Sequence, residues 1–158
     1  MIIVPEKEMA GLLNRADAFT AVENVFASMS KGAAYNIPVI REAIGHEAAL
    51  YGFLFDPDTG MVKAMVGGNL LTALRTAAAS SVSIKHLARK DAKVMGMVGA
   101  GHQATFQLRA ALEQRDFEKV IGWNYHPEML PNIEKVAAEA GVPFEAVELD
   151  GMVEADVV

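Results

Sequence analysis

The chain has 158 residues, and 52% hydrophobic with 22% charged residues is the balance of a globular rather than a disordered protein. With 14 basic and 20 acidic residues the net charge is −6, so nucleic acid is not an expected partner. The absence of cysteine excludes disulfides, thiolate catalysis and cysteine zinc sites, and no apolar run is long enough to predict a membrane span. The first residues lack the layout of a secretion signal, so we expect a cytoplasmic protein.

The first half of the chain mixes helical and strand patterns. Pro38 excludes a helix around it, and Asp-Pro-Asp-Thr-Gly at 56–60 is strong turn chemistry between two strand-like runs. The expected elements are helices from Pro5 and from about Asp17 to Gly32, an extended segment over 33–45, strands over 51–55 and 61–66, and a helix over 69–90. The run of small residues inside the last helix predicts close packing against another element.

From Lys93 the pattern alternates strand and helix, as a parallel α/β sheet requires. The expected elements are strands over 94–98, 119–123 and 144–149, helices from Gly101 to about Arg115 and from Pro127, and the start of a fourth strand at 155–158. The predicted fold class is α/β: a partial Rossmann-type parallel sheet, over residues 91–158, preceded by an α+β domain over 1–90.

One motif predicts a ligand. Residues 99–104, Gly-Ala-Gly-His-Gln-Ala, fit G-x-G-x-x-G/A between a predicted strand and a predicted helix. Gly99 makes the tight turn, Gly101 lets the backbone approach a pyrophosphate, and Ala104 lets the helix pack closely on the strand. The free N–H groups of the helix N-terminus then face the phosphates. The alternative interpretation is a glycine-rich turn that binds nothing, and the surrounding strands and helix favour nucleotide binding.

The cofactor is expected to be NAD rather than NADP. An acidic residue usually ends the second strand of such a unit and binds the adenosine ribose. Here that position is Asn124, which can still bond a hydroxyl and does not repel a 2′-phosphate. No arginine follows immediately, which favours NAD.

Two arginines are candidates for binding an anion. Arg75 lies among small residues of the long predicted helix, where either an anionic ligand or simple exposure to solvent would account for it. Arg41 is either a carboxylate-binding residue or an ordinary surface charge. The histidines at 46, 86, 102 and 126 are too scattered to predict a metal site, and none is expected.

Residues 71–113 and 55–69 resemble the ornithine cyclodeaminase/mu-crystallin family, above all in L-T-A-L-R-T-A-A-A followed by G-A-G-H-Q. That resemblance implies that residues 1–90 are a helix-and-sheet substrate-binding and dimerisation domain joined to an NAD-binding Rossmann domain over 91–158, and therefore a homodimer. It also implies that Arg75 lies near substrate and cofactor, that His102 and Gln103 touch the cofactor phosphates, and that Asn124 binds the ribose. Arg41 matches an arginine associated with the substrate carboxylate.

The family pattern departs from this sequence in two places. Members carry a few dozen residues, including an acid/base lysine, between segments that match Phe53 and Leu54, which are adjacent here. Members also continue past Val158 with further strands and a catalytic aspartate. We therefore expect this chain to lack the family lysine and aspartate, so its catalytic residues are unknown, and a joined set of fragments is one interpretation of the sequence.

The resemblance implies NAD(H)-dependent reduction of an imino acid to an amino acid, with iminosuccinate and L-aspartate the expected pair. The substrate is thus a small dicarboxylic or amino acid. Two alternatives stay open: cyclisation of ornithine to proline with release of ammonia, and NAD(P)H binding without catalysis.

Overall fold

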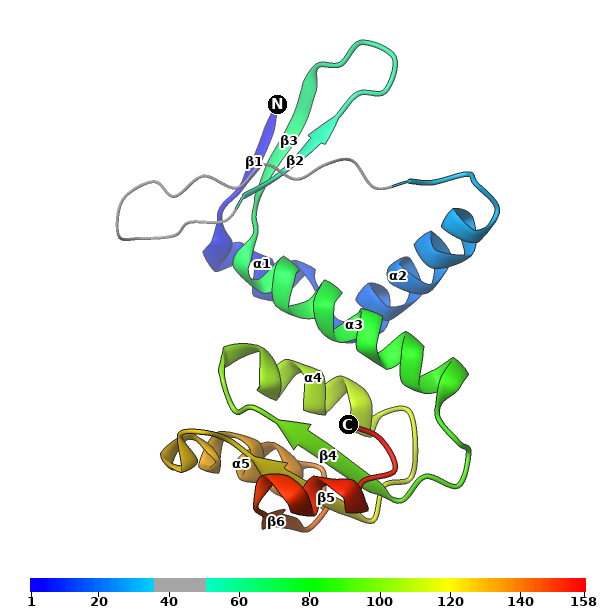
Figure 1. Cartoon of the computed structure of the whole chain (residues 1–158). Coiled ribbons are helices and arrows are strands. Elements are labelled where there is room, and N and C mark those ends of the chain that lie inside the picture. Colours follow the sequence, from blue (N-terminus) through cyan, green and yellow to red (C-terminus); the bar gives the residue numbers. More distant parts are fainter. Residues whose placement is uncertain (36–50) are drawn as a thin grey trace. The chain divides into compact units, whose positions relative to one another are not determined.

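A computed structural model describes residues 1–35 and 51–158. Arg41, and residues 36–45 of the predicted extended segment, lie outside the described residues. The rest forms two compact units, residues 1–75 and 76–158, each built on a three-stranded sheet (Figure 1). No helix within these residues is long and apolar enough to cross a membrane. A division into folding domains near residue 90 stays a prediction.

In the first unit, a short mixed sheet is joined to helices. Its strands lie in the order β1-β3-β2, with β1 parallel and β2 antiparallel to β3. Its elements are β1 (Ile2–Val4), α1 (Glu6–Leu12), α2 (Arg15–Ser30), β2 (Tyr51–Phe55), β3 (Val62–Gly67) and the first part of α3 (Asn69–Leu87). The predicted hairpin is confirmed, and Asp56 closes its turn by accepting the N–H groups of Asp58 and Thr59, each at 3.0 Å.

The elements up to the end of α3, which extends into the second unit, differ from the prediction in three ways. Strand β1 was not predicted, because three residues are too few to show a period. Helix α2 begins at Arg15 rather than near Asp17, since the Asn14 side chain caps it by accepting the Asp17 N–H. Helix α3 ends at Leu87, three residues before the predicted end.

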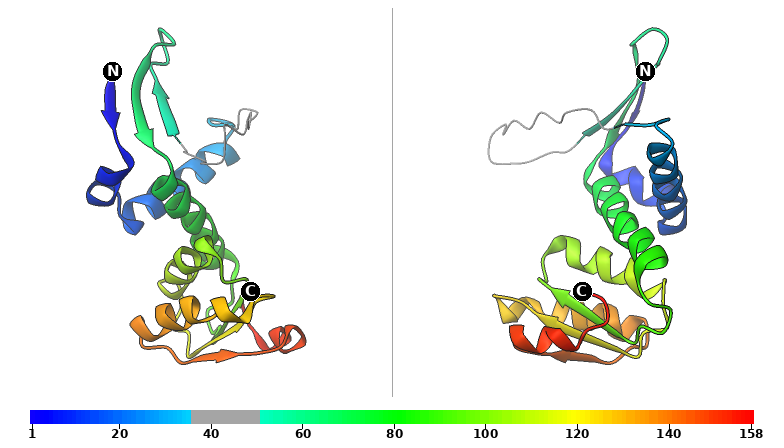
Figure 2. Two further views of the ribbon diagram at one scale, coloured as in Figure 1. Left: turned by 90° about the vertical axis from the view of Figure 1, so that its left-hand side faces the viewer. Right: turned by 45° about the vertical axis from the view of Figure 1, so that its right-hand side comes forward.

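The second unit is a parallel sheet in the order β4-β5-β6. Its elements after α3 are β4 (Val94–Val98), α4 (His102–Leu112), β5 (Lys119–Trp123), the 3-10 turn η1 (Pro127–Met129), α5 (Pro131–Glu139), β6 (Phe144–Ala146) and the 3-10 helix η2 (Leu149–Glu154). The further views in Figure 2 show α4 and α5 beside this sheet. This is the predicted mixed α/β fold with a Rossmann-type parallel sheet.

The core of the second unit lies between the sheet and its helices. Leu108 of α4 and Ile133 of α5 are fully buried against strand residues such as Val120. The predicted packing of the small-residue run is confirmed, because Ser81 of α3 is buried and its hydroxyl donates to the Ala110 carbonyl of α4 at 3.0 Å. A Cβ on Gly96 of β4 would lie 2.8 Å from the Cβ of Ala155, the residue after η2, so glycine allows this close approach.

Several predicted borders in the second unit are wrong. The strand predicted over 144–149 ends at Ala146, and Leu149–Glu154 forms a 3-10 helix instead. Pro127 begins a 3-10 turn rather than the long helix, which begins at Pro131. Helix α4 ends at Leu112 rather than near Arg115. The start of a fourth strand is present as one parallel bridge between Val157 and Met95.

Candidate functional site

The glycine motif forms the connection between β4 and α4. Gly99 has φ +100°, a conformation that only glycine adopts without strain, and its N–H donates to the Trp123 carbonyl at the end of β5 (2.8 Å). Gly101 precedes the first residue of α4 with an ordinary φ of −73°. A Cβ at either glycine would meet nothing within 4 Å, so the backbone is open to a ligand on that side.

The N-terminus of α4 is well suited to an anion. No side chain caps it, and Ala104 is buried in the core cluster, which brings the helix close to the sheet. N–H groups in the first turn of a helix have no partner further back in that helix, and they lie at the positive end of its dipole. The turn and the helix therefore meet the chemical requirements of a pyrophosphate.

Asn124 follows β5 directly and joins two parts of the site. Its Oδ1 accepts the N–H of Ala100, between the two glycines, at 3.2 Å. Its Nδ2 donates to the carbonyl of His126 at 2.6 Å. The residue expected at the ribose is thus already bonded to the glycine turn.

The two residues after Gly101 differ in their surroundings. His102 is exposed, and its ring centroid lies 5.4 Å from that of Phe106, one turn along α4. Gln103 is half-buried, and its Oε1 is a buried oxygen that accepts no hydrogen bond within the described part of the chain. A buried acceptor without a donor costs about 1–3 kcal/mol.

The two predicted substrate arginines are not part of the second unit. Arg75 is exposed on α3 in the first unit, and within residues 1–35 and 51–158 no acidic side chain forms an ion pair with it. Arg41 is outside the described residues. Within the second unit, the structure brings the predicted cofactor residues together at one edge of the sheet; these are Gly99, Gly101, His102, Gln103, Ala104 and Asn124.

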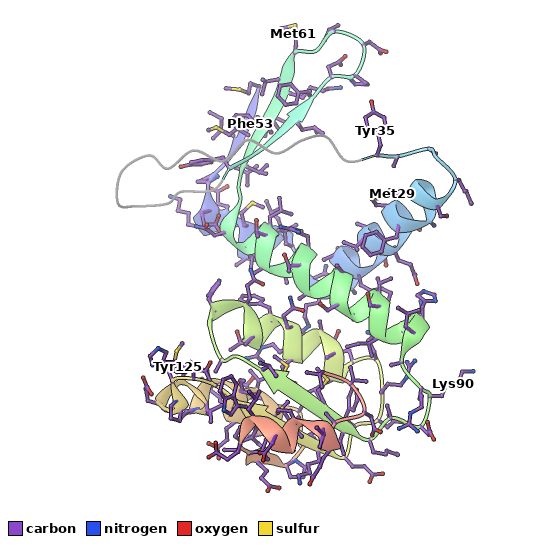
Figure 3. The ribbon with its side chains drawn as sticks, in the orientation of Figure 1. Met29, Tyr35, Phe53, Met61, Lys90 and Tyr125 are labelled. Atoms are coloured by element: carbon purple, nitrogen blue, oxygen red, sulfur yellow. The ribbon has the colours of Figure 1, made fainter. Side chains whose placement is uncertain are left out.

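Tyr125 lies beside the candidate nucleotide site, although the sequence pattern did not single it out as a site residue. It follows Asn124 at the same edge, its side chain projects outward (Figure 3), and it is 80% exposed. Its ring lies edge-on to His126 with centroids 5.1 Å apart, and His126 Nδ1 is 3.4 Å from Glu128 Oε1. Its place directly after the ribose position was the available signal.

A parallel sheet whose first strand turns through two glycines into a helix N-terminus is a Rossmann-type fold. The chain belongs to the ornithine cyclodeaminase/mu-crystallin family, whose model matches residues 40–158. It is 56% identical over its whole length to the iminosuccinate reductase of Paracoccus denitrificans. It is 34% identical, over 86% of its length, to the ketimine reductase mu-crystallin of Rattus norvegicus.

Solved structures match the fold closely. The crystal structure of the Paracoccus denitrificans reductase in complex with NAD+ superposes with a TM-score of 0.89 over 99% of this chain. A Thermococcus litoralis Δ1-pyrroline-2-carboxylate reductase, solved with NADH and L-proline, has a TM-score of 0.84 at 27% identity over 99% of this chain. The chain spans 61% of the Paracoccus sequence, 42% of the rat sequence, and 60% and 61% of the two solved chains.

Proposed function

We propose that this chain carries the nucleotide-binding turn and part of the substrate site of an NAD(H)-dependent reductase that converts imino acids to amino acids. Iminosuccinate and L-aspartate are the proposed substrate and product. The observation that carries the proposal is the glycine turn between β4 and α4, open to a ligand at Gly99 and Gly101. The 56% identity to a reductase solved with NAD+ supports the same cofactor here.

In this proposal the residues of the chain bind and orient rather than react. The turn at Gly99 and Gly101 admits the pyrophosphate, and the first N–H groups of α4 donate to it. Arg75 and Arg41 hold carboxylates of the substrate, because a guanidinium pairs with a carboxylate through two parallel hydrogen bonds. When bound, NADH supplies the hydride that turns an imine into an amine. No catalytic residue is proposed within this chain.

The proposed cofactor is NAD rather than NADP. Recognition of a 2′-phosphate needs a cation near the end of β5. Between Asn124 and Lys135 the sequence has no lysine or arginine, and His126 is paired with Glu128. A 2′-phosphate at this edge would therefore lie near a carboxylate, with no lysine or arginine from this segment to bind it.

An alternative is NAD(P)H binding without catalysis. The observation in its favour is the direct junction of Phe53 and Leu54, where the family pattern places a segment with an acid/base lysine. The alignment with the Paracoccus reductase runs over 194 residues, 36 more than the 158 of this chain, which supports an internal segment missing here.

We also propose a homodimer located in the cytoplasm. The sheet of the first unit supports self-association, because large apolar side chains of β1 and β2 are exposed on it. The lack of cysteine suits a reducing compartment.

The proposal is tested with the purified chain, NADH, and oxaloacetate plus ammonium, which together form the imine. We expect NADH to bind, and substrate-dependent loss of its absorbance would identify the reductase. Binding without turnover on any imine precursor would favour the binding protein. Absence of NADH binding would overturn both, and net formation of proline from ornithine would instead identify the cyclodeaminase reaction.

A matched pair of variants links binding to the turn. Gly101 and Gly11 both have open space where a Cβ would be placed and neither has a positive φ, so Gly101→Ala and Gly11→Ala leave the fold intact. We expect Gly101→Ala to weaken NADH binding by about tenfold or more, because the methyl group lies where the pyrophosphate approaches. Gly11→Ala should leave NADH binding unchanged. Equal affinities in the two variants would count against a pyrophosphate at this turn.

A further inference from the structure

The side-chain amide of Asn124 is hydrogen-bonded at both its oxygen and its nitrogen within the protein. Its oxygen accepts the Ala100 N–H and its amide group donates to the His126 carbonyl. The first bond reaches across from the end of β5 to the turn after β4. The second bond holds the side chain itself in the orientation that the first one needs.

The glycine turn needs a hydrogen bond of this kind because its residues leave the backbone unusually free to move. Ala100 lies between two glycines, the residues with the greatest backbone freedom. Only the bond from the Gly99 N–H to Trp123 otherwise links the start of the turn to β5 among the described residues. Ala100 is 0% exposed, so its N–H would be left buried and unpaired without Asn124.

We propose that Asn124 is a positioning residue that holds the glycine turn in its ligand-binding conformation, and that this is its main contribution to binding NADH. The inference rests on the proposed function and changes the role expected for this residue. A residue that binds the adenosine ribose offers a free acceptor to the ribose hydroxyls. The oxygen of Asn124 is instead directed at Ala100.

The two roles predict different ligand dependence. NADH and NADPH share the pyrophosphate and differ at the adenosine ribose, so loss of a positioning residue weakens both by the same factor. Loss of a ribose-binding residue changes the ratio of the two affinities. Aspartate does not replace asparagine in the positioning role, because a carboxylate oxygen would face the His126 carbonyl oxygen at the 2.6 Å now spanned by a hydrogen bond.

The experiment compares Asn124→Ala and Asn124→Asp with the control Asn132→Ala, an exposed asparagine in the first turn of α5. Hydrogen exchange of the Ala100 amide is measured without ligand, and circular dichroism establishes that each variant is folded. The dissociation constants of NADH and NADPH are then measured through the fluorescence of Trp123, the only tryptophan of the chain and the neighbour of Asn124.

We expect both Asn124 variants to speed exchange of the Ala100 amide. Asn124→Ala should weaken NADH and NADPH equally, by about tenfold, the effect of one hydrogen bond. The affinity ratio is read from Asn124→Ala alone, because the carboxylate of Asn124→Asp itself repels a 2′-phosphate. Asn132→Ala should change neither readout. Unchanged exchange at Ala100, or a change in the ratio of the NADH and NADPH affinities in Asn124→Ala, would overturn the proposal. If the unaltered chain binds neither nucleotide, the proposed function fails, whereas the exchange rate still tests whether Asn124 holds the turn.

Discussion

Glu6 caps a helix that begins 63 residues later in the chain. Its two carboxylate oxygens accept the N–H groups of Asn69 (3.0 Å) and Leu70 (2.9 Å), the first residues of α3. Gly67 makes this possible, because a Cβ there would lie 2.5 Å from the Glu6 Cα. The N–H groups that start α3 are therefore paired with a carboxylate of this chain, and they are not offered to an anionic ligand.

We expect Glu6→Ala to lower the free energy of unfolding by about 1–2 kcal/mol, the usual cost of losing a helix cap. Glu6→Gln should cost less, because its amide keeps one acceptor oxygen. Urea unfolding gives both values. Glu8→Ala, in the same first turn but exposed, is the control and should stay within about 0.5 kcal/mol of the unaltered chain. Equal effects of Glu6→Ala and Glu8→Ala would contradict the capping role.

Gln103 gives the opposite expectation for stability. Because its buried Oε1 has no donor among the described residues, Gln103→Met should keep or raise the free energy of unfolding, by up to about 1 kcal/mol. Gln107→Met on the same helix is the control. If Gln103 touches the cofactor phosphates, as the family resemblance implies, Gln103→Met still weakens NADH binding. A loss of stability above about 1 kcal/mol would mean that the oxygen is paired in solution.

Among the elements, β4 and the end of α3 are held by single charged side chains. Arg115 donates to the carbonyls of Ile84, Lys85 and Ala88 through one nitrogen of its guanidinium, at 2.9–3.0 Å. These carbonyls belong to the last turn of α3 and the residue after it, where few backbone donors remain; the Ile84 carbonyl also accepts the Ala88 N–H at 3.2 Å. A residue of the loop after α4 thus caps the C-terminus of α3, and no sequence signal around Leu87 predicts that the helix ends there.

Asp156 holds the chain beside β4. Its carboxylate accepts the N–H groups of Lys93 (2.7 Å) and Val94 (2.9 Å) and pairs with Arg89, and its side chain is 21% exposed. The two backbone N–H groups are the main reason that the pKa of Asp156 lies below its ordinary value, and Arg89 adds to the effect. The next residue, Val157, can then form its bridge to Met95.

A carboxylate with a lowered pKa stabilises the fold above its unfolded pKa, and this contribution is lost as the pH falls through the folded value. We therefore expect Asp156→Asn to lower the Tm at pH 7, and the difference from the unaltered chain to shrink below about pH 4. Thermal melts from neutral to acid pH measure this. Asp150→Asn, exposed in η2, is the control. A difference in Tm that stays constant down to acid pH would show that the charge of Asp156 is not what stabilises the fold.

At the scale of the whole molecule, the sheet of the first unit governs the proposed assembly. The strand register aligns Ile3 of β1, Met65 of β3 and Phe53 of β2 across the sheet, and paired residues share a face. The Phe55 ring lies 6.4 Å from that of Phe53, which is 54% exposed and labelled in Figure 3. Leu54 lies on the other face and is 61% exposed.

If the homodimer forms through the Phe53 face, Phe53→Glu should shift the chain from about twice its 16.9 kDa mass to that of a monomer. A charge buried without a partner costs several kcal/mol, enough to separate the subunits. Sedimentation or light scattering gives the mass. Leu54→Glu, on the opposite face of the same strand, should leave the dimer intact. A dimer that survives Phe53→Glu, or that Leu54→Glu disrupts equally, would rule out this face.

The sequence by itself determined the features that depend on neighbours along the chain. Alternating strand and helix patterns after Lys93 predicted a parallel sheet, and the turn chemistry of 56–60 predicted the hairpin. Gly99 and Gly101 could be assigned to a turn because their spacing fits G-x-G-x-x-A between a strand and a helix. The positive φ of Gly99 is a conformation that glycine adopts without strain. Each of these features depends on residues that are close together in the sequence, so the local sequence pattern was sufficient to predict it.

Tertiary structure decided the features that depend on distant partners. The alternating pattern of 144–149 predicts a longer strand, but β6 ends at Ala146, paired with Gly122, because β5 itself ends one residue later. The pairing of β1 with β3 joins segments about sixty residues apart. The bond from Asn124 to Ala100 likewise joins residues 24 apart, and a pattern along the chain carries no record of which polar groups meet once it has folded.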